Sequence, residues 1–166
     1  MAYCIKCGTA LIEKYCEGEP HPIPYCQNCN EYRFETFNVA VCTGAFSPNR
    51  THILMMRQYG REKYNFLAGY INKGETAEQA LEREMIEEMN LIATEREYLY
   101  TTYYAKSNTL MLNYRTVVTS KDLSGQNNRE VDDARWFTYN DATKAVIPNS
   151  LAEKLLKSLK NWFQED

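Results

Sequence analysis

The amino-acid sequence predicts an α/β sandwich preceded by a small cysteine-containing segment. Runs rich in Val, Ile, Leu, Phe and Tyr, separated by turn residues, predict strands over 37–46, 51–58, 64–68, 95–105, 109–119 and 134–137. Helical patterns occupy 76–89, 138–145 and 149–163. Strands interrupted by helices in this way are typical of a sheet covered by helices. Two Cys-x2-Cys pairs precede the first of these strands.

The composition is that of an ordinary globular chain. Hydrophobic residues make up 44% of the 166 residues and charged residues 25%, which excludes a disordered, collagen-like or disulfide-packed protein. No uncharged apolar run reaches about 18 residues, so no membrane-spanning helix is predicted. The N-terminus lacks a basic start followed by an apolar run, so we expect a cytoplasmic location rather than secretion.

Acidic charge is concentrated in one segment. The formal net charge of −3 argues against a protein that coats nucleic acid. Between Glu75 and Glu88 the chain carries six acids and one base, while the remainder has a slight excess of bases. This distribution suits a site that holds divalent cations and receives an anionic ligand. A solvated helix face is the alternative interpretation.

Four of the six cysteines form two pairs, Cys4-x2-Cys7 and Cys26-x2-Cys29. Two residues between thiols allow one tight turn to present both sulfurs to an ion, and two such turns complete a tetrahedral zinc site. The residue after each pair, Gly8 or Asn30, tolerates the left-handed backbone that closes such a turn. The segment is too short for an apolar core of its own. We therefore expect a zinc ribbon over residues 1–34, with one structural zinc.

The other thiols leave some alternatives open. Disulfides are disfavoured because nothing in the sequence indicates export. Cys16 or His21 could replace one zinc ligand, although neither belongs to a pair. Cys42 lies in an apolar run and is interpreted as a small buried hydrophobic residue. Residues 1–30 contain two lysines and no arginine, so nucleic-acid binding by this segment is disfavoured.

Three carboxylates share one face of the predicted helix over 76–89. They are spaced i, i+3 and i+4 and fall within an arc of about 100°: Glu84, Glu87 and Glu88. Like charges held so close destabilise one another unless cations bridge them. Arg83, on the opposite flank of the carboxylates, is placed to pair with Glu75. Asn90 stands where the helix must end and predicts a left-handed cap.

The segment from Gly69 to Leu91, GYINKGETAEQALEREMIEEMNL, resembles the Nudix box, G-x5-E-x7-R-E-U-x-E-E-x-G-U, where U is a bulky apolar residue. Eight of the nine defined positions match, and Asn90 replaces the last glycine. The stretch REVDDARWF, from Arg129, resembles a segment found downstream of the box in the same family. The resemblance implies a Nudix domain over 35–166, an α/β/α sandwich with a mixed sheet.

The resemblance also implies a magnesium- or manganese-dependent hydrolase of a nucleoside diphosphate linked to another moiety. The implied catalytic residues are Glu75, Arg83, Glu84, Glu87, Glu88 and Glu130. The implied metal ligands are the backbone carbonyl of Ala68 and the carboxylates of Glu84, Glu87, Glu88 and Glu130. Glu75 and Arg83 would orient these ligands. The general base would be Glu130 or a glutamate of the box.

Several segments resemble the NADH pyrophosphatase group: the zinc pairs, TLMLNY at 109–114 and IPNSLAEKLL from Ile147. The S-Q-P-W-P-F-P-type array of that group is absent, because residues 101–108 read TTYYAKSN. Tyr103 and Tyr104 in this stretch are candidates to stack on a base, and ordinary packing is the alternative. NADH, NAD, ADP-ribose, FAD and a capped RNA end therefore all remain candidate substrates.

Two other function classes remain at this point. A non-catalytic Nudix-fold protein that senses a nucleotide is the main alternative, and the intact set of glutamates favours the enzyme over it. A zinc-ribbon nucleic-acid binder is disfavoured by the lack of a basic patch. The expected partner is a nucleotide-containing small molecule rather than a membrane or, apart from a capped end, nucleic acid. The zinc ribbon leaves a homodimer open.

Overall fold

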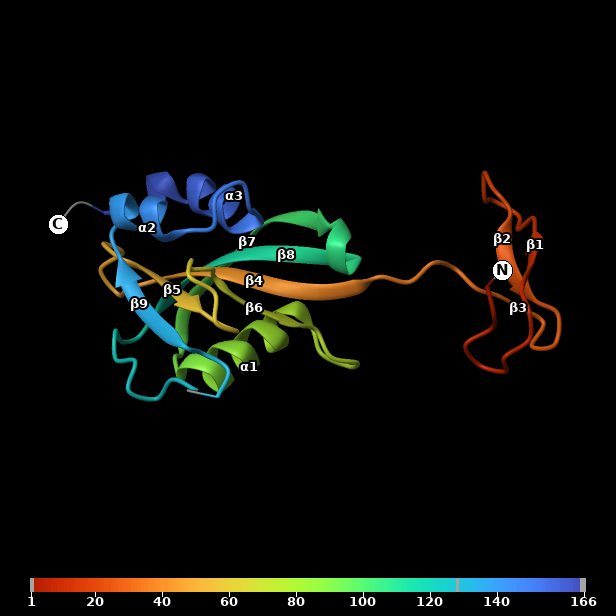
Figure 1. The fold of residues 1–166 in the computed structure, drawn as a ribbon, viewed down its shortest axis with the longest axis horizontal. Helices are drawn as coiled ribbons and strands as arrows, with labels where there is room; N and C mark the ends of the chain where they lie inside the picture. The colour runs from red at the N-terminus through yellow and green to blue at the C-terminus, as the bar shows by residue number, and fades with distance from the viewer. Residues whose placement is uncertain (1, 128, 165–166) are drawn as a thin grey trace. The chain divides into compact units, whose positions relative to one another are not determined.

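The structure is a computed structural model that describes residues 2–127 and 129–164 (Figure 1). It contains two compact units, Met1–Phe37 and Asn38–Asp166. The division between the units falls after Phe37, three residues beyond the domain boundary that the sequence predicts between residues 34 and 35. That domain boundary stays a prediction. Among the described residues, no helix combines the length and the apolar character needed to cross a membrane.

The first unit is built on three short antiparallel strands, in the order β1 (Ile12–Lys14), β2 (Ile23–Cys26), β3 (Glu31–Tyr32). Its buried hydrophobic residues are Cys4, Tyr25 and Cys26. The Tyr25 ring packs edge-on against Tyr32, with 4.9 Å between ring centroids. So small an apolar core provides little stability, which agrees with the expectation that a metal organises this segment.

The second unit contains a six-stranded mixed sheet. Its strands are β4 (Asn38–Phe46), β5 (Ile53–Arg57), β6 (Leu67–Tyr70), β7 (Ala93–Tyr104), β8 (Thr109–Val118) and β9 (Asp133–Phe137). They follow the order β7-β8-β4-β5-β9, and β6 also pairs with β4. Strands β4 and β8 are parallel, whereas the other neighbouring strands of this sheet are antiparallel.

Helices cover both faces of this sheet (Figure 1). Helix α1 (Ala77–Met89) lies on one face, and α2 (Tyr139–Ala145) and α3 (Leu151–Ser158) lie on the other. Alternate strand residues supply the two cores. One core joins α1 to the sheet through Val41, Leu67, Leu81, Met85 and Met89. The other joins α3 to Phe46, Ile53 and Phe66. The predicted α/β/α sandwich is therefore confirmed.

Cys42 belongs to the second of these cores, as its apolar surroundings predict. The residue is 8% exposed on strand β4. Burial away from water raises the pKa of its thiol to about 12. The thiol therefore stays protonated at neutral pH and packs as a small hydrophobic side chain.

Two elements differ from the sequence prediction. Strand β6 begins at Leu67, whereas a strand over 64–68 was expected. Two of the three expected residues before it form isolated bridges instead, Tyr64 to Val146 and Asn65 to Met56. The last helix was expected to reach 163 but ends at Ser158, and a 3-10 turn, η2 (Lys160–Trp162), follows it. The turn brings the rings of Trp162 and Phe163 onto Phe46, so tertiary packing ends the helix early.

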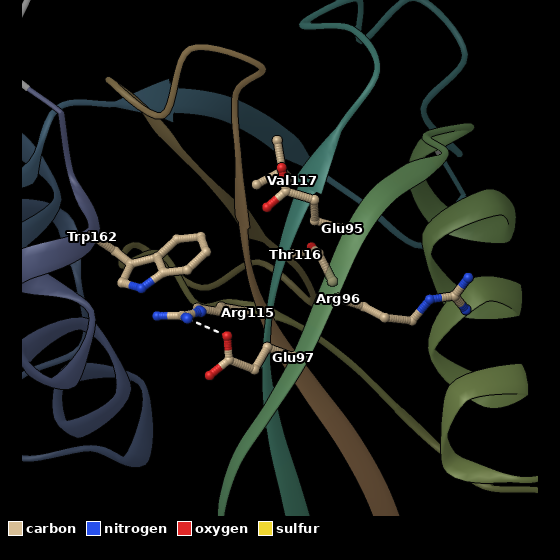
Figure 2. Close-up of a pocket in the computed structure, with 7 residues that line it drawn as sticks. All are labelled: Glu95, Arg96, Glu97, Arg115, Thr116, Val117 and Trp162. Carbon is tan, nitrogen blue, oxygen red and sulfur yellow. Dashed lines mark hydrogen bonds and ion pairs between the residues drawn. The ribbon is translucent and has the colours of Figure 1, made fainter.

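Trp162 fastens this C-terminal turn to the sheet. Figure 2 shows it beside Arg115, whose guanidinium carbon lies 3.1 Å from the Trp162 ring centroid. The guanidinium of Arg50 lies 4.5 Å from the same centroid. Each arginine also pairs with a glutamate of strand β7: Arg115 with Glu97, and Arg50 with Glu95. A small pocket of about 50 Å³ is lined by Trp162, Arg115 and residues of β7 and β8 beside them.

Truncating this indole is expected to destabilise the second unit. Trp162→Ala should lower the free energy of unfolding by about 2 kcal/mol, because it removes both apolar packing and two cation–π contacts. Urea unfolding followed by circular dichroism measures the change. Asn161→Ala, at an exposed position of the same turn, is the control. Equal stability of Trp162→Ala and the control would contradict this role.

Candidate active site and metal centre

The four paired cysteines of the first unit form one thiol cluster. Their sulfur atoms all lie within 4.8 Å of one another. The distance is 3.5 Å between the sulfurs of Cys7 and Cys26, 3.4 Å from Cys7 to Cys29, and 3.9 Å from Cys4 to Cys29. A tetrahedron with zinc–sulfur distances of about 2.3 Å requires sulfurs about 3.8 Å apart. The cluster therefore fits a four-thiolate zinc site.

Hydrogen bonds around the cluster lower the pKa of the Cys4 and Cys7 thiols and so favour the thiolates that bind zinc, whereas the contact with Cys7 raises the pKa of the Cys29 thiol to about 12. The Arg33 Nε donates to the Cys4 sulfur at 3.3 Å, and the Cys29 backbone N–H donates to Cys26 at 3.4 Å. Hydrogen bonding with Thr9 lowers the pKa of the Cys7 thiol to about 5.

The turns after both pairs adopt the expected left-handed backbone, with φ of 73° at Gly8 and 56° at Asn30. All six cysteines are free thiols in the structure. Neither Cys16 nor His21 belongs to the group whose ligand atoms lie together. The structure therefore brings together the four residues that the spacing predicts.

Helix α1 begins and ends where its sequence predicts. Thr76 caps the N-terminus: its hydroxyl accepts from the Gln79 N–H, and the Gln79 side chain accepts from the Thr76 N–H. Asn90 ends the helix in the left-handed conformation, with φ of 53°. The predicted use of asparagine in place of the usual glycine is confirmed.

Gly69 of strand β6 allows the Glu84 carboxylate to lie directly against the strand. A Cβ atom at this position would lie 1.9 Å from the Glu84 carboxyl carbon. Any larger residue would therefore displace the carboxylate. Leu81, Met85 and Met89, at 1% exposure or less, hold the adjoining side of α1 against the sheet. The glycine and the helix together fix the position of Glu84.

Arg83 connects the loop before α1 to the carboxylates of the helix. Its Nε and Nη2 bind both oxygens of Glu75, at 2.6 and 3.0 Å. This confirms the predicted pair, and Arg83 lowers the pKa of Glu75 to about 2. The Arg83 Nη1 also reaches Glu84 at 2.7 Å and Glu87 at 3.0 Å. Arg83 thus flanks the carboxylates on the side away from the apolar residues of the helix, as expected, and its long side chain also reaches the adjacent and i+4 glutamates.

Glu88 is the most buried carboxylate of the site, with 6% exposure. Its Oε1 accepts a hydrogen bond of 3.0 Å from Gln58 Nε2. Its Oε2 is buried and has no hydrogen-bond partner among the described residues. Burial raises the pKa of Glu88 to about 7, and the nearby charges of Glu84, Glu130 and Glu87 act in the same direction. A divalent cation would compensate both the burial and the repulsion.

The remaining predicted ligands lie around this carboxylate. Ala68 is half-buried on β6, next to Gly69. Glu130 is exposed, in a segment whose Asn127 N–H donates to the backbone oxygen of Glu88 at 2.8 Å. Within the described parts of the chain, only the four cysteines bring three or more ligand atoms within 4.8 Å of one another. The carboxylates therefore lie in the same part of the described structure, but no three of their oxygens come within this distance of one another.

Tyr103 and Tyr104 are neighbours on strand β7, so their side chains leave opposite faces of the sheet. They are 57% and 39% exposed. The Tyr103 hydroxyl donates to the Asn108 side chain. Their stacking on a base of the substrate stays a prediction. Because the two side chains leave opposite faces of the sheet, at most one of them can stack on a given base.

Sequence reasoning missed Gln58. It lies just after β5 and belongs to no recognised motif, so no signal in the sequence marks it. Its contact with Glu88 joins residues that are 30 positions apart. Only the packing of the turn after β5 against α1 reveals it.

Residues 36–160 match the family model of the NUDIX domain. The chain is 26% identical over 161 residues to a Haemophilus influenzae protein named NAD-capped RNA hydrolase NudC, a match that covers 93% of this chain and 58% of that protein. It is 22% identical over 155 residues to the Pseudomonas aeruginosa protein of the same name, covering 93% and 54%. The chain thus spans little more than half the length of these curated relatives.

Solved structures agree on the fold. A NUDIX hydrolase from Nitrosomonas europaea superposes with a TM-score of 0.69 at 20% identity, covering 99% of this chain and 94% of that one. The NUDIX domain of Shewanella oneidensis NrtR, solved with ADP ribose, gives a TM-score of 0.62 at 17% identity, covering 83% and 91%. Because the family model matches well over half of the residues, the chain belongs to the Nudix family.

Proposed function

We propose that this protein is a hydrolase that cleaves the pyrophosphate bond of a nucleoside diphosphate linked to another moiety. The observation that carries this proposal is the buried carboxylate of Glu88, beside Glu84 and Glu87 on one helix, whose Oε2 has no hydrogen-bond partner among the described residues. The curated relatives are named NAD-capped RNA hydrolases. NAD contains two nucleosides joined by a pyrophosphate, so NAD(H)-like dinucleotides, ADP-ribose and FAD form the proposed substrate class.

The site fits a hard divalent cation. Magnesium or manganese prefers oxygen ligands. Glu88 Oε2, which is buried and has no hydrogen-bond partner in the described part of the chain, is a ligand of this kind. The proposed ligands are the carboxylates and one backbone carbonyl: Glu84, Glu87, Glu88, Glu130 and the Ala68 oxygen. When bound, the cation offsets the negative charge of the pyrophosphate and activates water for attack.

The remaining groups position these ligands or move protons. Glu75 holds the Arg83 guanidinium through both oxygens, and Arg83 in turn holds Glu84 and Glu87. Arg83 also donates to the Tyr70 backbone oxygen at 2.9 Å, which ties it to the end of β6. We assign the general base to Glu130 or to a glutamate of the box. Glu130 is exposed and can exchange protons with solvent.

We also propose that the thiol cluster binds one structural zinc. Thiolates favour zinc over magnesium, so the two metal sites are chemically distinct. A cytoplasmic location, in which thiols stay reduced, is part of the same proposal.

Product analysis tests the proposed reaction. With magnesium, NADH should give AMP and reduced nicotinamide mononucleotide, and ADP-ribose should give AMP and ribose phosphate. Chromatography identifies the products, and ¹⁸O-water locates the phosphorus that is attacked. Release of free nicotinamide, or of inorganic phosphate from every substrate, would refute the proposal. Tight binding without turnover would instead indicate the nucleotide-sensing alternative.

Gly69→Ala tests the close approach of Glu84 to strand β6. The added Cβ would overlap the Glu84 carboxylate. Because the carboxylate is the end of a flexible side chain, it should move aside while the backbone fold stays the same. We expect turnover to fall about tenfold and the melting temperature to stay near that of the wild type. Steady-state kinetics and thermal unfolding measure the two effects. Wild-type turnover in a folded Gly69→Ala variant would contradict the need for this contact.

A further inference from the structure

We propose that Gln58 is a positioning residue that leaves one chosen oxygen of Glu88 available to the divalent cation. The inference rests on the proposed function, because it assumes that the carboxylates bind such a cation. Gln58 lies outside the recognised motif and contacts the site from the turn after β5. It would act through Glu88 and would not touch the substrate.

The two oxygens of Glu88 have different surroundings. Oε1 accepts the hydrogen bond from Gln58 Nε2 at 3.0 Å. Oε2 is buried and lacks a hydrogen-bond partner within the described residues. Buried carboxylate oxygens are normally paired, and an unpaired one is costly. A contact that served the fold alone would not explain why the second oxygen is left open.

The turn that carries Gln58 is held in an uncommon conformation. Tyr59 and Gly60 both adopt the left-handed region, with φ of 59° and 67°. This backbone conformation is rare for an aromatic residue. Asp132 holds the turn from outside, since its carboxylate accepts from the Gly60 N–H at 2.8 Å and its N–H donates to Arg57 at 2.9 Å. The amide of Gln58 is therefore aimed by backbone that the surrounding structure fixes.

Glu88 is fixed in the same way from the other side. Its backbone oxygen accepts from the Asn127 N–H at 2.8 Å, and Asn90 ends the helix two residues later. With both backbones fixed, the hydrogen bond sets the rotation of the carboxylate group. Removing a group that orients a metal ligand in this way typically weakens metal binding about 10- to 100-fold.

Binding of Mn²⁺ to the full chain tests the inference without any turnover. Gln58→Met keeps the length of the side chain but removes the donor, and the electron paramagnetic resonance signal of free Mn²⁺ reports the affinity. We expect Mn²⁺ to bind about tenfold more weakly, with unchanged circular dichroism. Gln164→Met is the matched control, because it makes the same exchange at an exposed position. In a Glu88→Gln background, Gln58→Met should have no further effect.

The outcomes separate this inference from the proposed function. If Glu88→Gln binds Mn²⁺ as the wild type does, the proposed cation site itself is wrong. If Glu88→Gln weakens binding but Gln58→Met does not, the positioning role alone is overturned. Should Gln58→Met fail to fold, Gln58→Asn keeps an amide that is one methylene too short, and the same loss of affinity is expected. Wild-type affinity in that variant would also overturn the inference.

Discussion

Glu88→Gln is expected to lower turnover of pyrophosphate substrates by about 100-fold or more while the protein stays folded. The exchange preserves the shape of the side chain and removes its charge. Glu88 is the buried member of the carboxylate set, and its Oε2 has no partner among the described residues. The variant therefore loses the strongest candidate ligand. Glu87→Gln should act in the same direction.

Steady-state kinetics at saturating substrate and magnesium measure this effect. Glu82→Gln is the matched control, because it makes the same exchange on the same helix at a surface ion pair with Arg96. Such exposed pairs contribute little to stability, so the control should behave as the wild type does. Wild-type turnover of both Glu88→Gln and Glu87→Gln, also at limiting magnesium, would count against the metal assignment.

Glu88→Gln is expected to lower turnover but to raise the stability of the fold. Burial raises the pKa of Glu88 in the folded protein to about 7, above its ordinary value of 4.5. The folded state therefore holds a proton that the unfolded state releases, and stability falls as pH rises from about 4.5 to 7. Glutamine carries no such cost. In buffer without divalent cations, Glu88→Gln should thus melt at a higher temperature than the wild type above pH 7, which would show stability given up for function.

The parts of the site that the sequence predicts are those set by local spacing. The Glu75–Arg83 pair spans eight residues, and the cap at Asn90 depends on a single backbone conformation. Both follow from helix geometry and from the residues themselves. Gln58 could not be predicted, because its contact depends on how the turn after β5 packs against α1. The additional contacts of Arg83 with Glu84 and Glu87 depend on the side-chain rotamer, which spacing does not determine.

The fold shows the same division. Long strands such as β4 and β8 and the capped helix α1 follow from hydrophobic pattern, and their ends agree with the prediction within one or two residues. The early end of α3 does not follow from pattern, because Leu159 and Trp162 continue the helical spacing. It results from docking of Trp162 against Phe46 and the two arginines. Contacts between distant segments override local preference at this point.

Loss of zinc is expected to unfold the first unit completely. The unit buries few apolar side chains, so it lacks a core that could hold strands β1 to β3 together. Binding of zinc to a four-ligand site is worth about 10 kcal/mol or more, and in a segment this small that energy is folding energy. Elemental analysis should find about one zinc per chain. Cys7→Ser should lose it, because Cys7 lies within 3.5 Å of two other sulfurs of the cluster.

Limited proteolysis and elemental analysis together test this prediction. In Cys7→Ser, or after strong chelation, cleavage should appear throughout residues 1–37, while the second unit, with its own two cores, stays protected. Cys16→Ser is the matched control, since Cys16 lies outside the cluster and its loss should leave both zinc and protection unchanged. Full zinc occupancy in Cys7→Ser would rule out the four-cysteine site. Zinc loss without new cleavage would show instead that the three strands hold together by their own contacts, which include the edge-on packing of Tyr25 against Tyr32.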